Sequence, residues 1–510
     1  MSESDPGFGA GNDTSRSSLA ADVFSSRWAL VLVALGMAIG TGNIWRFPRI
    51  LAKFDGGGTF LIPWMIFLFS WSIPLLIVEF SIGRSTRHGV IASLGSMLGP
   101  RFGFIGAFVA LCTTMILCYY AVVAGWCGIY VYESLAGNVA DMDTKTATDW
   151  FVGRAQGGLA TLATVVALVI SAYFVSRGLR NGIERANKIL LPTLFALLFV
   201  LMIFGLTRDG AGQGVAWLFK VNGDQLATAS PWLEALSQSA FSTGAGWGLL
   251  LTFAIGSADK GTGIGNAVMT GIGNNVASLI AALAIVPAIF ALAPLASADP
   301  VQVLQTNSPG NTGMAMVWIP QLFGEIGPAG RWLAAAFFLT LAFAAITSLI
   351  AMVELATRCM MDLGFDRHRS ILVVTVAALL VGLPSALNLE FLSNQDWVWG
   401  LGLLVSGFLC VLAVKAVGFR EFRENWIRDD PTRRPLGAWF DVLLAALIPL
   451  QFVVLLGWWF QQSLSWAKSG STSPWDPFDT YSIGTCLTQW AAAFFVLFLL
   501  RGKLRRHSLS

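Results

Sequence analysis

Apolar residues fall in long runs that are separated by short polar connections along almost the whole chain. A helix needs about 20 apolar residues to cross the hydrocarbon core of a bilayer, and within lipid its backbone must bond to itself. The pattern therefore predicts an all-α integral membrane protein with twelve transmembrane helices. The twelve runs lie at residues 28–54, 59–82, 103–133, 158–175, 185–206, 232–256, 268–294, 331–358, 370–387, 395–416, 438–466 and 484–501.

Composition excludes several other classes of protein. Of the 510 residues, 55% are apolar and only 12% are charged, whereas soluble domains carry about 25% charged residues. A soluble enzyme and a disordered chain are both excluded, and the net charge of +3 gives no indication of a nucleic-acid partner. Five of the six cysteines lie inside apolar runs and Cys359 lies at the end of one, and we interpret all six as packing residues. No paired acids, serine–histidine pair or metal-binding histidines occur in these runs, so the protein is not expected to be an enzyme.

The positive charges predict how the chain lies in the membrane. With the N-terminus inside, 21 of the 32 lysines and arginines fall in the cytoplasmic connections and the C-terminal tail. Because cytoplasmic loops are enriched in these residues, both termini are predicted to be cytoplasmic, in a multi-pass protein of the cell (inner) membrane. The predicted divisions are a disordered tail (1–26), a first five-helix repeat (27–206), a second five-helix repeat (232–416) with an external lid (295–330), two further helices (438–501) and a basic tail (502–510).

Glycine clusters interrupt the first and the sixth apolar runs. Residues 36–43 contain three glycines, and residues 242–248 contain three more. Each glycine costs a helix about 1 kcal/mol relative to alanine, and non-helical backbone at membrane depth is tolerated where it lines a cavity. Close packing of helices through small residues is the alternative for a single cluster. Two clusters at corresponding positions of two repeats favour a binding site near the middle of the membrane.

The residues around the first cluster carry a family resemblance that extends over nearly the whole chain. Residues 40–48 read GTGNIWRFP and are followed by three glycines at 56–58. Together with Glu79 and the segment 182–185, these motifs resemble the neurotransmitter:sodium symporter family. The resemblance implies the leucine-transporter-like fold, with two inverted five-helix repeats broken in spans 1 and 6. It also implies symport of a substrate with sodium, with two sodium ions as cofactors.

The resemblance implies a site for an amino-acid substrate at the break. The substrate carboxylate would meet free amides at Thr41 and Gly42 and the hydroxyl of Tyr120, since half-helix N-termini suit anions. Monoamine carriers of the family place an aspartate where this chain has Gly40, which favours a substrate that brings its own carboxylate. The segment 242–248, with Trp247, resembles the corresponding segment of the glycine carriers, and this favours a small neutral amino acid as the substrate. The complete expected set is Ala38, Thr41, Gly42, Ile116, Tyr120, Phe241, Gly244, Trp247, Ser348 and Met352.

Sodium is a hard cation that takes oxygen ligands, and the resemblance implies two sets of them. The first set is the Ala38 carbonyl, Asn43, Ser242, Asn274 and the substrate carboxylate. The second set is the carbonyls of Gly36, Ile39 and Ala344 with the hydroxyls of Thr347 and Ser348. An alternative for these two hydroxyls is a hydrogen bond to the preceding helical turn; together with the broken first span, we favour sodium binding.

Further roles are implied for charged and polar residues. Arg46 and Asp396 would form an external gate above the substrate, and Glu79 would bond the unwound backbone of span 6. Asp362 matches the acid of the family's cytoplasmic latch, for which Arg27 is the candidate partner. A chloride site is neither indicated nor excluded, because Trp64 stands where chloride-dependent members have a tyrosine. The corresponding chloride residues are Gln238, Ser242, Asn274 and Ser278.

These observations favour a sodium-coupled secondary transporter of a small neutral amino acid. A proton-coupled carrier, or a carrier of betaine or another amine, is the first alternative. A non-transporting scaffold or sensor of the same fold is the second. The complete set of oxygen ligands argues against the scaffold, which would not need Asn43, Asn274, Thr347 and Ser348 together.

Overall fold

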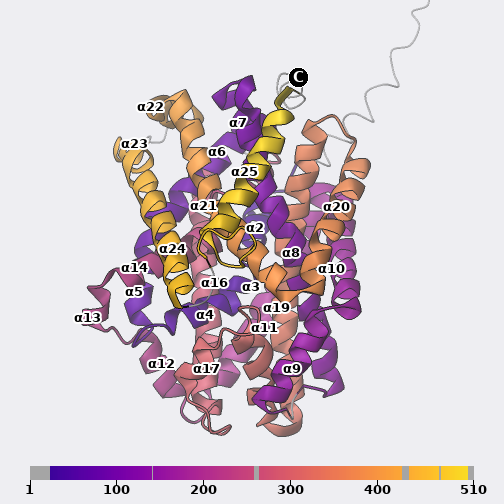
Figure 1. Ribbon diagram of the computed structural model, residues 1–510, viewed down its shortest axis with the longest axis vertical. Coiled ribbons are helices and arrows are strands. Elements are labelled where there is room, and N and C mark those ends of the chain that lie inside the picture. The colour runs from indigo at the N-terminus through magenta and orange to yellow at the C-terminus, as the bar shows by residue number, and fades with distance from the viewer. Residues whose placement is uncertain (1–22, 140–141, 258–262, 428–435, 470–472, 503–510) are drawn as a thin grey trace, which may run out of the picture.

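A computed structural model describes residues 23–139, 142–257, 263–427, 436–469 and 473–502. Over these residues the protein is built of helices and their connections, with no strand. The helices follow the predicted runs in order, and Figure 1 shows them as a bundle with its long axis vertical. The first run is divided into α2 (Arg27–Ala38), α3 (Thr41–Ile44) and α4 (Arg46–Leu51), and the sixth into α14 (Ala229–Ser242) and α15 (Leu249–Ala254).

The remaining predicted runs form single helices or helices with one distorted turn. The second run consists of α5 (Gly58–Phe67) and α6 (Ile73–Thr86), joined by a π-helical turn. The others are α8 (Gly103–Ala136), α10 (Gly158–Ser176), α11 (Arg185–Leu206), α16 (Gly263–Leu292), α19 (Gly330–Asp362), α20 (Arg367–Leu387), α21 (Leu389–Val417), α24 (Ile448–Ser469) and α25 (Ile483–Leu499). The eleventh run begins with α23 (Trp439–Val442), which a π-helical turn joins to α24. Short helices lie in the connections: α7 (Val90–Leu98), α9 (Thr144–Ala155), α12 (Ala211–Phe219), α13 (Gly223–Leu226), α17 (Pro300–Gln305), α18 (Ile319–Gly324) and α22 (Phe419–Glu421).

Nine helices of the described chain are long and apolar enough to cross a membrane. The other predicted spans are the two broken ones and α25, which has 17 residues. Twelve spans are therefore compatible with the structure. The all-helical membrane architecture that the apolar runs predict is confirmed.

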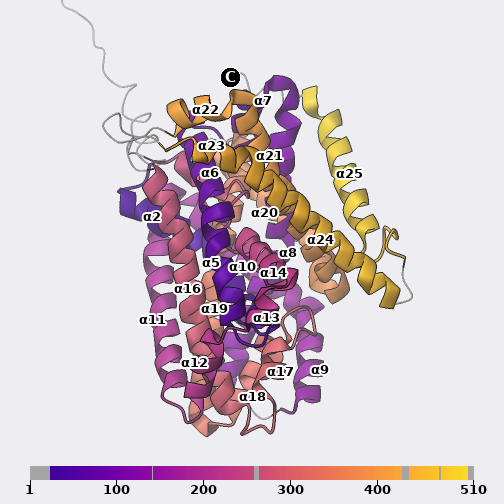
Figure 2. The same cartoon turned by 90° about the vertical axis from the view of Figure 1, so that its left-hand side faces the viewer.

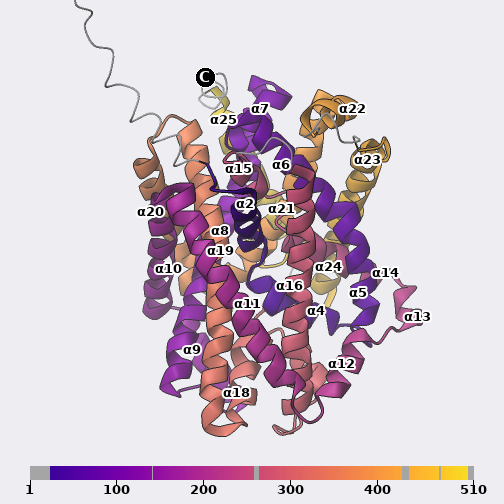
Figure 3. The same ribbon diagram turned by 180° about the vertical axis from the view of Figure 1, so that it is seen from behind.

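Burial separates the inner helices from the outer ones. In α8 and α21, 78% of the most apolar window is buried, against 33% in α10. The outer face of α10 exposes apolar side chains such as Leu162, Val166 and Val169, as expected of a helix that faces lipid. The broken helix α2 lies inside this bundle, where it packs against α11, α16 and α19 (Figure 3). The unwound segments are thus held away from lipid.

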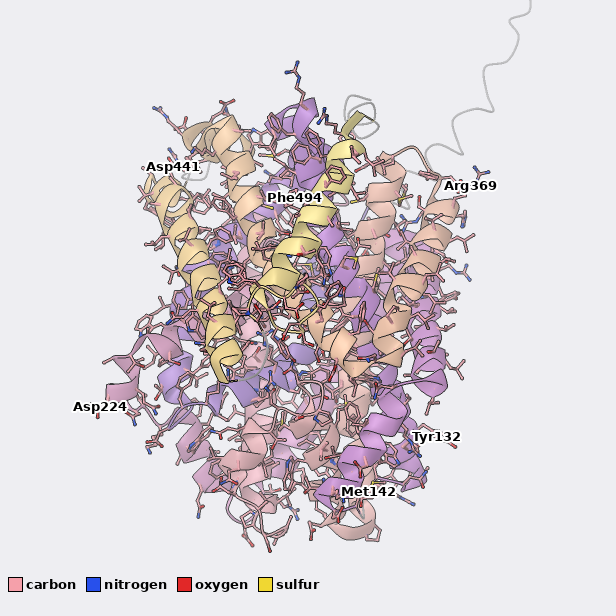
Figure 4. All side chains as sticks on the ribbon, viewed as in Figure 1. Tyr132, Met142, Asp224, Arg369, Asp441 and Phe494 are labelled. Atoms are coloured by element: carbon pink, nitrogen blue, oxygen red, sulfur yellow. The ribbon has the colours of Figure 1, made fainter. Side chains whose placement is uncertain are left out.

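The described chain begins and ends at the same end of the molecule, which we call the termini end. Figures 1 and 2 show α7 and α22 at this end and α9, α17 and α18 at the opposite one, which we call the lid end. Figure 4 places the charged side chains of Arg369 and Asp441 at the termini end and that of Asp224 toward the lid end. The predicted lid is helical: it contains α17 and α18.

The predicted disordered tail (1–26) is too long. Phe24 is 4% exposed, and its ring meets Phe253 edge-on at 6.2 Å between centroids. Ser25 donates from both its backbone and its hydroxyl to the carboxylate of Glu184. These residues belong to the packed fold because an apolar ring and a buried acid hold them; residues 1–22 lie outside the described chain.

Candidate functional site

The first break separates α2 from α3. Helix α2 ends at Ala38, and Ile39 and Gly40 adopt extended backbone before α3 begins at Thr41. The freed amide of Gly40 donates to Oδ1 of Asn43 at 3.0 Å, so one side chain of the expected sodium set also caps the second half-helix. The glycine-rich sequence therefore produces the predicted break, and the backbone around it is open to other partners.

The second break depends on three glycines and one acid. Gly244, Gly246 and Gly248 have φ values of +69°, +87° and +79°, a left-handed region that costs glycine little and other residues more. The carboxylate of Glu79, which is 0% exposed, accepts from the amides of Gly248 at 3.0 Å, Leu250 at 3.1 Å and Leu251 at 3.3 Å. The expectation that Glu79 bonds the unwound backbone of span 6 is confirmed.

A single cavity of about 460 Å³ lies between the two breaks. The hydroxyl of Tyr120 reaches from α8 to α3, where the amide of Thr41 donates to it at 3.1 Å and the Thr41 hydroxyl lies 3.1 Å away. Trp247 closes part of the wall, and its carbonyl accepts from the Thr113 hydroxyl at 2.7 Å. All ten residues of the expected substrate set line this cavity: Ala38, Thr41, Gly42, Ile116, Tyr120, Phe241, Gly244, Trp247, Ser348 and Met352.

The residues of the first sodium set converge beside the cavity. Oδ1 of Asn274 lies 3.1 Å from the Ala38 carbonyl oxygen and 3.1 Å from the Ser242 carbonyl oxygen, and Nδ2 of Asn43 donates to it at 2.8 Å. Oxygens this close repel one another unless a donor or a cation lies between them. Rotating the Asn274 amide would supply a donor; a sodium ion would satisfy the same oxygens without rotation. The donor set fits a hard cation.

The second sodium set lies between α2 and α19. The hydroxyl of Thr347 bonds back to the carbonyls of Phe343 at 3.0 Å and Ala344 at 3.1 Å, as the alternative interpretation expects. The Ser348 hydroxyl instead donates across to the Met37 carbonyl at 3.4 Å. A hydroxyl that donates its proton keeps its lone pairs for a cation, so both hydroxyls can serve a site with the carbonyls of Gly36, Ile39 and Ala344.

The two expected gate residues do not pair with each other. Among the ion pairs of the described residues there is none between Arg46 and Asp396. The Arg46 guanidinium lies over the ring of Phe241 at 4.6 Å, while Asp396 accepts from the Tyr119 hydroxyl at 3.0 Å. Both residues line the cavity, which also reaches Asn311, in the lid segment between α17 and α18, and Tyr481, between α24 and α25. The cavity is thus open toward the lid end.

Three of the four chloride positions come together. Ser278 donates to the Asn274 carbonyl at 3.2 Å and accepts from Asn43 at 2.8 Å, and Ser242 is within 3.0 Å of Nδ2 of Asn274. Oε1 of Gln238 and the indole nitrogen of Trp64 are buried with no hydrogen-bond partner in the described chain. A tyrosine hydroxyl is absent from this cluster because residue 64 is tryptophan.

The proposed partner of Asp362 is wrong. Nε of Arg27 donates to Oδ1 of Asn266 at 2.9 Å, so Arg27 ties α2 to α16 at the termini end. Asp362 lies instead beside Gly89, at the start of α7. The sequence places Arg27 correctly at the beginning of the first span, but its partner depends on the rotation of that helix.

Several residues of the site were missed from the sequence. The hydroxyl of Tyr119 donates to Asp396, and that of Thr113 donates to the Trp247 carbonyl. Arg49 lines the cavity, as the two expected gate residues do. Asn187 on α11 is buried beside Gly36. Each is a polar residue inside an apolar run, and this is the signal that could have identified them.

Comparison with known proteins identifies the family to which these motifs belong. A family model of the sodium:neurotransmitter symporters matches residues 21–155 and 152–463. The chain belongs to this family. Its members are transporters rather than enzymes, and this chain is a sodium-dependent, multi-pass membrane transporter.

Three relatives illustrate the similarity. An uncharacterized sodium-dependent transporter of Methanocaldococcus jannaschii is 29% identical over 445 residues, which cover 84% of this chain and 88% of the relative. Another from Bacillus subtilis is 30% identical over 379 residues, covering 73% of this chain and 80% of the relative. The crystal structure of MhsT in complex with L-phenylalanine superimposes with a TM-score of 0.73 at 26% identity, over 85% of this chain and 98% of MhsT. The leucine-transporter-like fold is thereby confirmed.

Proposed function

We propose that this transporter couples sodium to the import of a small neutral amino acid by alternating access. The observation that carries the proposal is the convergence of the ten expected substrate residues on one cavity between two broken helices, with one set of oxygen ligands beside this cavity and the other between α2 and α19. The structure of the family member MhsT contains L-phenylalanine, which supports an amino acid as the class of substrate.

Neighbouring groups of residues bind the substrate and the sodium ions. The free amide at Gly42 and the hydroxyl of Tyr120 bind the substrate carboxylate, which also completes the first sodium site at Asn43 and Asn274. Sodium supplies the positive charge beside that carboxylate, so that substrate and ion bind better together than apart. Phe241, held under Arg46, covers the substrate when Arg46 approaches Asp396.

The charges orient the protein in the membrane. In the sequence, 21 of the 32 lysines and arginines fall in the connections and tail predicted to be cytoplasmic. Arg369, in one of these connections, lies at the termini end (Figure 4), and we assign this end to the cytoplasm. The cavity then opens to the outside, and the structure corresponds to the state that receives substrate. Phe24, Ser25 and Arg27 hold the cytoplasmic end together through Phe253, Glu184 and Asn266.

Sodium is expected to be required for ligand binding. The purified protein is heated with each of the common amino acids, in sodium and in choline buffer of equal ionic strength. A small neutral amino acid is expected to raise the unfolding temperature in sodium and to have little effect in choline, because the ion and the carboxylate share one site. Equal stabilisation in both buffers would contradict sodium coupling.

Trp247 is expected to limit the size of the substrate. Its indole lines the side-chain end of the cavity together with Gly244, Met352 and Ile116. The change Trp247→Phe opens space without adding a polar group, so valine or leucine should gain relative to glycine and alanine. A mismatch of one methylene in a hydrophobic pocket is worth about 1–3 kcal/mol, or roughly 10–200-fold.

Competition binding on both proteins measures this shift. Tyr132 is exposed, lies toward the lid end (Figure 4) and does not line the cavity, so Tyr132→Phe serves as the control that should leave selectivity unchanged. If the unaltered protein already prefers leucine or phenylalanine to glycine, Trp247 does not set the size limit.

A further inference from the structure

Asn187 is a buried amide inside a membrane-spanning helix. It lies near the start of α11 and is 1% exposed. Its Nδ2 donates to the carbonyl of Ile183, one turn earlier, at 2.9 Å. Its Oδ1 is buried and has no hydrogen-bond partner in the part of the chain that the structure describes. Burying an acceptor without a hydrogen bond costs free energy inside a membrane protein, so a ligand such as a cation is the partner to consider for this oxygen.

The amide cannot correct this by rotating. After a half turn, Oδ1 would face the carbonyl of Ile183, and two acceptor oxygens would oppose each other. The Ile183 carbonyl therefore fixes which end of the amide points away from α11. Oδ1 is the end that projects toward α2.

The free oxygen lies beside Gly36, a residue of the second sodium set. It is 1.8 Å from the point where a Cβ on residue 36 would lie, so only glycine leaves room for it. That same Cβ position is 3.4 Å from Cβ of Thr347 on α19. Helix α11 thus brings an unpaired oxygen to the place where α2 and α19 contribute Gly36 and Thr347. These neighbours supply carbonyl and hydroxyl oxygens, and a hard cation is the partner that such neutral oxygens share.

We propose that Oδ1 of Asn187 is a further ligand of the sodium ion that binds between α2 and α19, in addition to the oxygens of Gly36, Ile39, Ala344, Thr347 and Ser348. The inference rests on the proposed function, since it needs sodium at this site. The ion then holds three helices together instead of two, so its departure releases α11 as well as α2. Gly36 is required at its position because any side chain there would displace the ligand.

The test measures sodium binding itself, by the binding of radiolabelled sodium and by the sodium concentration that gives half of the thermal stabilisation, both without an amino acid. Asn187→Ala removes the oxygen and should raise this concentration about tenfold or more, a loss typical when a group that supports a metal site is deleted. Asn187→Asp keeps an oxygen and adds a charge, so it should lower the concentration and enlarge the stabilisation by saturating sodium. Ser385→Ala removes another buried, unpartnered polar atom, on α20, and should change neither value.

The results separate this inference from the proposed function. If sodium does not stabilise or bind to the unaltered protein, both the ligand role of Asn187 and the proposed function are contradicted. A sodium-dependent protein whose Asn187→Ala variant has the same half-saturating concentration would overturn the ligand role alone. If Asn187→Ala does not fold, Asn187→Asp decides: a smaller stabilisation by sodium than in the unaltered protein would show a packing residue and overturn the proposal.

Discussion

Replacing Glu79 by alanine is expected to abolish ligand binding and to destabilise the protein severely. The carboxylate is the acceptor for three amides where the unwound segment meets α15: that of Gly248 and, in the first turn of the helix, those of Leu250 and Leu251. Each of the three buried amides left without a partner costs about 1–3 kcal/mol, so the free energy of unfolding should fall by about 3–9 kcal/mol. The unwound segment would then no longer hold Gly244 and Trp247 in the cavity wall, and ligand binding would be lost.

The size of the effect should follow the number of acceptors that remain. Glu79→Gln keeps one oxygen and is expected to be intermediate in unfolding temperature and in ligand affinity. Glu390→Ala removes an exposed acid from the first turn of α21 and should match the unaltered protein in both. A Glu79→Ala protein that unfolds and binds normally would show that the broken span does not depend on this carboxylate.

Asn274→Ala is expected to weaken sodium-dependent ligand binding strongly while the protein stays folded. The variant loses the oxygen that lies 3.1 Å from the Ala38 and Ser242 carbonyls. Asn43 keeps Ser278 at 2.8 Å and Ser242 at 3.2 Å as acceptors, so no buried amide is orphaned on that residue. Sodium affinity should fall by about 10–100-fold, and ligand affinity should fall with it because the two share the site.

Titration of ligand binding with sodium checks this expectation. Thr270→Ala is the matched control, one turn earlier on α16, where a buried hydroxyl bonds only its own helix at Asn266. The control should keep the sodium dependence of the unaltered protein. Normal sodium dependence in Asn274→Ala would show that the first sodium site lies elsewhere.

The fold was predictable because it depends on features that can be read directly from the sequence, the apolar runs and the glycine clusters. Apolar runs record which segments face lipid or core, and the glycines at 244, 246 and 248 mark where the backbone takes left-handed φ values. The cavity wall also followed from the motifs, since residues fixed to the broken helices and to α8 and α19 keep their positions along each helix.

The side-chain partners were less predictable because helix rotation and the conformational state determine them. Tyr119 and Tyr120 are adjacent in sequence, yet they point about 100° apart around α8, so one bonds Asp396 and the other Thr41. Arg46 and Asp396 line the same cavity but have other partners, the ring of Phe241 and the hydroxyl of Tyr119. Asn187 could not be assigned from its run alone, because its neighbour Gly36 is brought to it by the packing of α2 on α11.

The most direct test of the account is uptake by the protein reconstituted in lipid vesicles. The amino acid that gives the largest thermal shift is added outside, with an inward gradient of sodium or of choline and with equal pH on both sides. The account predicts accumulation above the outside concentration only with the sodium gradient, and its collapse when a sodium ionophore is added. Equal uptake in choline, or accumulation that follows an imposed proton gradient instead, would contradict sodium-coupled symport.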